Sequence, residues 1–340
     1  MNSASVSPSP PGRPVADGPV LALDLGASRI RVAVVTPDGR LLARDDGRTP
    51  GAAGPAAVVQ ACIDRLRGVL GRLDDETRAA VAGVGIAAPG PVDPQTGVLI
   101  EPPNVGPGFR DVPFGAPIAE ALGLPVALER DTNVAALGEQ AFGAARGARD
   151  FLYLTVSTGI GGGIVAGGEL YGGAAGVAGE IGHIAAGVDE PPCGCGAAGH
   201  LEAISSGSGI VRQAHIAIAA GTAPGLARMV AYLAPASLEA HHVAEAEAAG
   251  DPAAVAIMDR ARRTFAAAVV GLVNVFNPEL VVIGGSIAHA QDDRLVTLAR
   301  QQVSQFAFRI PRERVRVVPA ALGDDVGLVG AQPLLGLRRR

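Results

Sequence analysis

Apolar and polar positions near the beginning of the chain predict a strand, a tight turn and a hairpin, followed by a helix and a further strand. The apolar run from Val20 to Asp24 leads into alternating apolar and polar residues over 30–34, and Pro-Asp-Gly at 37–39 predicts the turn into a third strand. Apolar residues then recur at helical spacing over 55–70, before the apolar run 81–87. We therefore expect the order βββαβ here.

The middle of the chain repeats the opening pattern. After a short strand at 126–128, Asp131 or Thr132 is expected to cap a helix over 134–142. A strand at 151–156 then meets a glycine turn and a returning strand. Two strand-turn-strand units about 130 residues apart predict two related halves that face a shared cleft.

The rest of the chain predicts a long helix followed by strands. Helical spacing of apolar residues extends over 253–276, and the buried strand 280–283 leads into Gly284 and Gly285. A strand at 315–319 and a closing helix over 326–337 complete the pattern. The two glycines either make room for an adenine or ribose or serve packing alone.

Composition excludes several kinds of chemistry. All 28 basic residues are arginine, so a Walker-type phosphate loop and a pyridoxal Schiff base, which both need lysine, cannot be built. A net charge of −5 argues against nonspecific binding of nucleic acid, and no apolar run resembles a membrane span. Three cysteines, two of them in one tripeptide, fit a reducing compartment, so we expect a cytoplasmic protein.

Two thiols and two imidazoles lie close together in the sequence, at His183, Cys193, Cys195 and His200. Zn²⁺ prefers such ligands in a tetrahedral shell, and four of them leave no open position for a catalytic water. We therefore expect a structural zinc. The alternative is a flexible glycine loop that contains cysteines by chance.

Two glycine turns are candidates for binding phosphate. In the first, a carboxylate at a strand end can hold a hydrated Mg²⁺, and small residues let phosphate oxygens approach the backbone. The second turn makes phosphate binding a better interpretation of both than tight turning alone. The expected phosphate and magnesium contacts are Asp24, Gly26, Ala27, Ser28, Thr158 and Gly159.

Asp131 is the candidate general base. Phosphoryl transfer to a hydroxyl requires a carboxylate that accepts the proton of this hydroxyl, while Mg²⁺ and backbone amides neutralise the transferred group. Glu180, His183 and Glu202 could bind further hydroxyls.

The Asp24 turn, the apolar run 84–91, the segment 131–139, the turn 158–163 and the cysteine cluster resemble, in matching order, the ROK family of sugar kinases and repressors. The glucokinase-like members are the most similar, and the similarity extends over nearly the whole chain from Val20. It implies an α/β, actin-like ATPase (ribonuclease H-like) fold, with two α/β domains flanking a cleft. It also implies ATP and Mg²⁺ in the cleft, and phosphorylation of a sugar hydroxyl, usually at C6.

The resemblance assigns further roles by position. It makes His183 both a zinc ligand and a sugar ligand. The sugar-binding positions that it implies are Asn104, Asn133, Glu180, His183 and Glu202. Homo-oligomers, either dimers or tetramers, are usual for the family.

The expected domains follow from the Ser- and Pro-rich start of the chain, which predicts a disordered tail, and from the same resemblance. A disordered tail is expected over 1–18, an N-terminal α/β domain over 19–130 and a C-terminal α/β domain over 131–324. The closing helix at 325–337 is expected to complete the first domain, and the zinc loop 183–200 belongs to the second.

Two departures from the family pattern leave alternatives open. His200 stands where a third cysteine is usual, so the zinc set would be Cys₂His₂. Arg130 stands where glucokinases commonly have a sugar-binding asparagine, so the substrate is glucose, another hexose or an N-acetylated hexosamine. Whether polyphosphate replaces ATP also stays open. A sugar-responsive repressor is the rival class, but few residues precede Val20 for a DNA-binding domain, and Asp131 favours catalysis.

Overall fold

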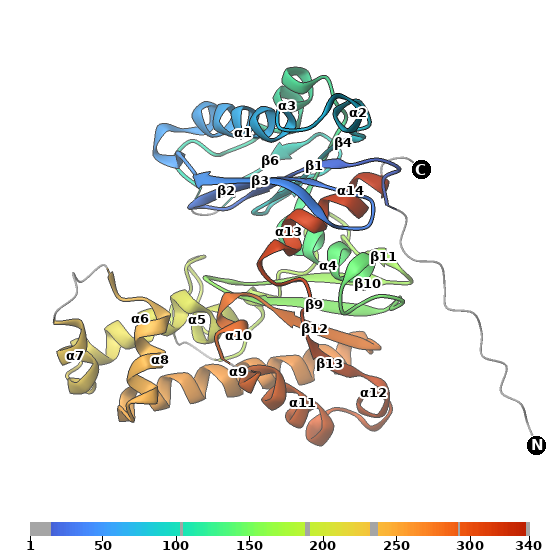
Figure 1. The fold of residues 1–340 in the computed structure, drawn as a ribbon. Coiled ribbons are helices and arrows are strands. Elements are labelled where there is room, and N and C mark those ends of the chain that lie inside the picture. The colour runs from blue at the N-terminus through green and yellow to red at the C-terminus, as the bar shows by residue number, and fades with distance from the viewer. Residues whose placement is uncertain (1–14, 103–104, 188–190, 232–236, 292, 338–340) are drawn as a thin grey trace, which may run out of the picture. The chain divides into compact units, whose positions relative to one another are not determined.

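The computed structural model describes residues 15–102, 105–187, 191–231, 237–291 and 293–337, and Figure 1 labels its elements. The chain divides into two compact units. Unit 1 comprises the residues up to Arg149 together with 164–178 and 321 onward, and unit 2 comprises 150–163 and 179–320. The domain boundary expected after residue 130 stays a prediction.

Unit 1 is built on a five-stranded sheet of order β3-β2-β1-β4-β8. Its strands are β1 (Val20–Leu25), β2 (Arg29–Val35), β3 (Leu41–Arg48), β4 (Gly83–Ala88) and β8 (Val126–Arg130). β1, β2 and β3 form an antiparallel meander, whereas β1, β4 and β8 are parallel. The helices α1 (Pro55–Leu70) and α2 (Asp75–Ala79) and the short η1 (Gly51–Ala53) connect β3 to β4. The predicted order βββαβ is confirmed.

Helices cover both faces of this sheet (Figure 1). Successive side chains of a strand point to opposite faces, so Leu21 and Leu23 join one core with α1 and α3 (Gly115–Leu122), while Val20 and Ala22 join another. The second core contains α4 (Asp131–Phe142), α13 (Val326–Val329) and α14 (Ala331–Leu337). A small antiparallel sheet also belongs to unit 1 and consists of β5 (Val92–Asp93), β6 (Val98–Leu99) and β7 (Val112–Pro113).

The buried side chain of Gln332 in α14 joins the end of the chain to its beginning. Its Oε1 accepts a hydrogen bond from the Ala16 N–H at 3.1 Å, and its Nε2 donates to the carbonyls of Gly18 at 2.8 Å and Val35 at 3.1 Å. Ala16 is 1% exposed, so the folded part begins within the segment that we expected to be a disordered tail. Residues 1–14 of that segment lie outside the described residues.

Two local predictions about unit 1 are wrong. Neither Asp131 nor Thr132 caps α4, because β8 leads directly into the helix: Arg130 is the N-cap and Asp131 the first helical residue. The predicted closing helix over 326–337 is divided into α13 and α14 at Gly330. There the backbone passes so close to α4 that a Cβ would clash with the Val134 carbonyl oxygen.

We expect Gly330→Ala to lower the free energy of unfolding by about 1–3 kcal/mol, because the added methyl group must displace the backbone of α4. The φ of Gly330, −65°, is one that alanine adopts readily, so only the close approach opposes the change. Gly68→Ala, in an exposed and open part of α1, is the matched control. It should raise the free energy of unfolding by about 0.5–1 kcal/mol. Denaturant unfolding measures both changes, and equal effects would contradict the prediction.

Unit 2 contains three parallel strands, β9 (Phe151–Val156), β12 (Leu280–Gly284) and β13 (Arg316–Pro319). The full sheet order is β11-β10-β9-β12-β13, with β10 (Ile160–Ala166) and β11 (Glu169–Leu170). The division between the two units falls within β10. The helices α9 (Pro252–Phe276) and α11 (Arg294–Phe306) pack against each other. The predicted strands at 151–156 and 280–283 and the long helix are confirmed.

A helical subdomain of unit 2 has its own core, formed by apolar residues such as Ile210, Leu226, Val243 and Met258. Its helices are α6 (Gly207–Ala219), α7 (Pro224–Val230), α8 (Ala240–Ala248) and the first part of α9. The remaining short elements among the described residues are η2 (Ile181–His183), α5 (Leu201–Ser205), α10 (Ser286–His289), α12 (Arg309–Arg314) and η4 (Gly323–Asp325). Among the helices that the structure describes, none combines the length and apolar character needed to cross a membrane.

Candidate active site

The turn after β1 places a carboxylate beside small, exposed residues. Asp24 lies opposite Arg31 in the β1–β2 pair, and the Arg31 guanidinium donates a hydrogen bond to Asp24 Oδ2. The backbone of Gly26 closes the turn with a 2.8 Å hydrogen bond, and Ala27 and Ser28 are exposed. Burial raises the pKa of Asp24, and the positive charge of Arg31 opposes that rise. A phosphate or a hydrated cation can approach this turn.

Asp131 is exposed and begins α4, and its Oδ1 accepts a hydrogen bond from Thr132 N at 2.7 Å. The positive end of the helix dipole favours the ionised carboxylate there. Because β1, β4 and β8 are parallel, the end of β1 with Asp24 and the end of β8 before Asp131 belong to the same edge of the sheet. Ligands of open α/β sheets bind at this carboxyl edge.

Asn133 is buried in the first turn of α4, in a hydrogen-bonded network that the sequence did not predict. Its Nδ2 donates to Glu129 Oε1 at 3.0 Å, and its Oδ1 accepts from Arg130 Nη2 at 3.5 Å. The same guanidinium nitrogen donates to the carbonyl of Ala178 at 2.6 Å. Arg130 therefore joins the start of α4 to the segment before Glu180. Asn104, another predicted sugar contact, lies outside the described residues.

The second glycine turn is held by backbone and hydroxyl contacts within unit 2. Ser157 Oγ lies 2.8 Å from Ser286 Oγ, which joins the ends of the parallel strands β9 and β12. The backbone N–H groups of Gly207 and Ser208, at the start of α6, donate to the carbonyls of Ser157 at 2.8 Å and Thr158 at 3.1 Å. Thr158 is exposed. Ser206 caps α6, since its Oγ accepts a hydrogen bond from Gly209 N at 3.0 Å, and this helix start was not predicted although serine is a preferred N-cap residue.

Protein contacts account for the two glycines after β12. A Cβ at Gly284 would lie 2.9 Å from the Ala320 Cβ, and one at Gly285 would lie 2.6 Å from Thr155 Oγ1. Gly285 also has a φ of 97°, a value that residues other than glycine rarely adopt. Close packing thus explains both residues, and their contact with a nucleotide stays a prediction.

The four predicted metal ligands do meet in unit 2. One ligand atom from each of His183, Cys193, Cys195 and His200 lies within 4.8 Å of all the others. Nδ1 of His200 is 3.3 Å from both His183 Nδ1 and Cys195 Sγ, and Cys193 Sγ is 3.9 Å from His183 Nδ1. Ligand atoms of a tetrahedral zinc lie about 3.3–3.8 Å apart, given metal–ligand bonds of about 2.0–2.3 Å. The donor set and its spacing therefore fit a metal ion.

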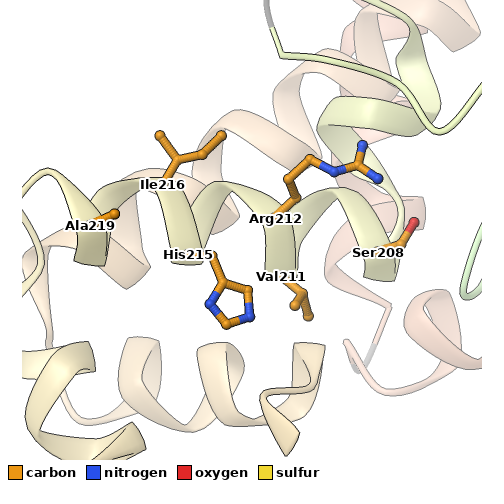
Figure 2. Close-up of a pocket in the computed structure, with 6 residues that line it drawn as sticks. All are labelled: Ser208, Val211, Arg212, His215, Ile216 and Ala219. Carbon is orange, nitrogen blue, oxygen red and sulfur yellow. The ribbon is translucent and has the colours of Figure 1, made fainter. Parts of the chain in front are cut away.

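The helix α6 supports the metal loop from one side. Arg212 Nη1 donates to the carbonyl of Pro192 at 2.5 Å, directly before Cys193. Figure 2 shows Arg212 among the side chains of α6 that line a pocket of about 490 Å³, from Ser208 at one end to Ala219 at the other. None of the predicted site residues lines this pocket. The pocket nevertheless adjoins the second glycine turn at its Ser208 end, because the N–H of Ser208 donates to the Thr158 carbonyl.

Each unit thus gathers its own set of predicted site residues. Unit 1 contains Asp24, Gly26, Ala27, Ser28, Asp131 and Asn133, and unit 2 contains Thr158, Gly159, Glu180, His183, Cys193, Cys195, His200, Glu202, Gly284 and Gly285. Glu180 is exposed, whereas Glu202 is half-buried, and its Oε2 accepts a hydrogen bond from Ile160 N at 2.9 Å. The carboxylates of the two sets are suited to proton transfer, and the hydroxyls are suited to donating hydrogen bonds to phosphate.

Known proteins match this chain over most of its length, in sequence and in structure. The model of the ROK family matches residues 20–336. A glucokinase of Halalkalibacterium halodurans is 33% identical over 312 residues, which are 91% of this chain and 92% of that protein. A crystal structure of a ROK family glucokinase from Streptomyces griseus, in complex with glucose and AMPPNP, is 32% identical with a TM-score of 0.75. The match covers 93% of this chain and 99% of that one.

A ROK family transcriptional regulator, a homologue of the E. coli MLC protein, is also similar, with 25% identity and a TM-score of 0.77. The match covers 94% of this chain and 78% of the regulator. The chain belongs to the ROK family, and its structure has the predicted actin-like ATPase fold class.

Proposed function

We propose that the protein is an ATP-dependent sugar kinase that phosphorylates a hexose hydroxyl, with glucose and its C6 hydroxyl as the first candidate. The observation that carries the proposal is the exposed Asp131 carboxylate at the start of α4, at the same sheet edge as the Asp24 turn. The similarity to glucokinases over most of the chain supports it, as does the relative whose structure contains glucose and AMPPNP.

In the proposed reaction, Asp131 accepts the proton of the attacking hydroxyl. Its place in the first turn of α4 and the hydrogen bond from Thr132 N orient the carboxylate, and the positive end of the helix dipole attracts its negative charge. Asn133 contributes an amide to the sugar, and its orientation is held by Glu129 and Arg130. Glu180, His183 and Glu202 are proposed to bind further sugar hydroxyls.

Phosphoryl transfer needs positive charge and backbone donors near the transferred group. Mg²⁺, when bound, would neutralise the phosphate oxygens. Asp24 would hold the hydrated ion: Arg31 binds Oδ2, and Oδ1 can accept from a metal-bound water. Gly26, Ala27 and Ser28 in one turn, Thr158 and Gly159 in the other, and Gly284 and Gly285 after β12 are the proposed contacts of ATP. None of these contacts is a lysine, so they would use backbone N–H groups and the hydroxyls of Ser28 and Thr158 as donors.

The Cys/His cluster is proposed to hold a structural zinc. All four ligands come from protein, which leaves no position for substrate, so the metal would fix the loop and the imidazole of His183. This imidazole could then bind a sugar hydroxyl in a fixed orientation.

We also propose a homo-oligomer, a dimer or a tetramer. Exposed apolar side chains at the ends of α9 and α11 and at α12 support association, namely Val275, Phe276, Phe306, Phe308 and Ile310. Light scattering of the purified protein would measure its mass. A cytoplasmic location stays a prediction from the scarcity of cysteine.

Two alternatives remain within the family: a kinase of another hexose or an N-acetylhexosamine, and a regulator that binds sugar without phosphorylating it. The buried Arg130 favours the first, because it replaces an asparagine expected to contact the sugar. The similar regulator supports the second.

The test is ADP release from Mg-ATP with glucose, mannose, fructose, N-acetylglucosamine or N-acetylmannosamine, and with polyphosphate as an alternative donor. We expect release that depends on one of these sugars, with glucose as the first candidate. Binding of sugar and AMPPNP without turnover for any of them would instead support the regulator.

A further inference from the structure

The two histidines of the Cys/His cluster adjoin two elements that contact the same residue of the glycine turn. His183 is the last residue of η2, and His200 directly precedes α5. A backbone hydrogen bond from Leu201 N to Ile184 O, 3.0 Å long, holds these elements side by side. Both elements reach Ile160, the residue after Thr158 and Gly159.

The first contact comes from α5. Oε2 of Glu202 accepts a hydrogen bond from the Ile160 N–H at 2.9 Å. The turn lies so close to this carboxylate that a Cβ at Gly159 would be only 2.6 Å from the same oxygen. A side chain at position 159 would therefore push the Glu202 carboxylate away from its hydrogen bond with Ile160.

The second contact comes from η2. Gly182 lies against the carbonyl of Ile160, and any Cβ at this position would clash with that oxygen. The N–H of Ile160 is thus held by α5, and its C=O lies against η2. A metal ion that joins His183 to His200 would fix the spacing between the two elements.

We propose that Glu202 is a positioning residue for the glycine turn, and that the Cys/His cluster with its metal keeps η2 and α5 closed on Ile160. The inference rests on the proposed function, in which this turn binds the phosphates of ATP. Loss of the Glu202 carboxylate or of the metal then weakens nucleotide binding even when no sugar is present. A contact between Glu202 and sugar alone would not have that effect.

The test measures binding of Mg-AMPPNP by calorimetry without sugar, for the unmodified protein, Glu202→Ala, Glu202→Gln and the protein treated with a zinc chelator. We expect Glu202→Ala and chelation each to raise the Kd about tenfold, since a hydrogen bond to a charged group is lost or loosened. Glu202→Gln keeps an oxygen that can accept from Ile160 N, so its Kd should stay within about threefold. Glu313→Ala, an exposed glutamate on α12 in the same unit, should bind as the unmodified protein does.

Amide hydrogen exchange of the peptide 157–163 is the second readout. Faster exchange in Glu202→Ala and in the chelated protein, with unchanged exchange in β12, would show loosening confined to the turn. Unchanged Kd values together with unchanged exchange would overturn the inference. If the unmodified protein does not bind AMPPNP, the proposed function fails, and exchange at 157–163 alone then supports or overturns the link between Glu202 and the turn.

Discussion

Asp131→Asn is expected to lower kcat for the preferred sugar by about 10²–10⁴-fold, because an amide cannot accept the proton of the attacking hydroxyl. The asparagine side chain has nearly the same size, and its Oδ1 can still accept the hydrogen bond from Thr132 N. KM should therefore change much less than kcat. Steady-state ADP release with Mg-ATP and varied sugar separates the two parameters.

Asp75→Asn is the matched control for this substitution. Asp75 is also an exposed acid at the first residue of a helix of unit 1, α2, but it belongs to no predicted site. Both substitutions remove a negative charge that the positive end of a helix dipole stabilises, so each should lower the stability only slightly. Only Asp131→Asn should lower kcat by about 10²–10⁴-fold. A kcat within tenfold of the unmodified value would assign the base to another residue.

Replacement of Cys195 with serine is expected to release zinc and to lower the free energy of unfolding by several kcal/mol. The reason is that metal binding in a structural site adds directly to the free energy of folding. The unmodified protein should contain bound zinc, and the variant should contain only a trace. Elemental analysis after dialysis gives the content, and thermal unfolding gives the loss of stability. A zinc-free unmodified protein would refute the metal site.

Cys62→Ala provides the control for the loss of a thiol. Cys62 lies in the core of unit 1, and burial raises the pKa of its thiol to about 12, so it stays protonated. Its replacement should leave a small cavity and cost about 1 kcal/mol, with the zinc content unchanged. Equal zinc loss in both variants would indicate general unfolding and not loss of a ligand.

Periodicity in the sequence predicted the strands and long helices because those signals are local. The apolar run from Val20 to Asp24 is enough to predict β1, and the helical spacing of apolar residues is enough to predict α9. The start of α4 was predicted wrongly because β8 continues to Arg130 with no linking residue. The closing helix is broken at Gly330, which packs closely against Val134. These two residues are almost 200 positions apart in the sequence, so no local pattern can encode their contact.

The candidate site shows the same division. Ligand types and spacing were enough to predict that His183, Cys193, Cys195 and His200 come together. The contact of Arg130 with Ala178 and that of Glu202 with Ile160 join residues 48 and 42 positions apart. Such contacts depend on how the elements pack, so sequence reasoning assigned Glu202 to sugar binding and overlooked its hydrogen bond to the glycine turn.

The hydrogen bonds of Gln332 have a consequence for how the protein is made. Synthesis proceeds from the N-terminus, and N-terminal domains usually fold first. Here β1 emerges early from the ribosome, but α13 and α14, which cover one face of its sheet, are made last. Unit 2 comprises residues 150–163 and 179–320, all of which are synthesised before the last segment of unit 1. Unit 2 can therefore complete its core before unit 1 does. A chain that stops before Gln332 would lack α14, so the apolar face that α4, α13 and α14 share would stay partly exposed and prone to aggregation.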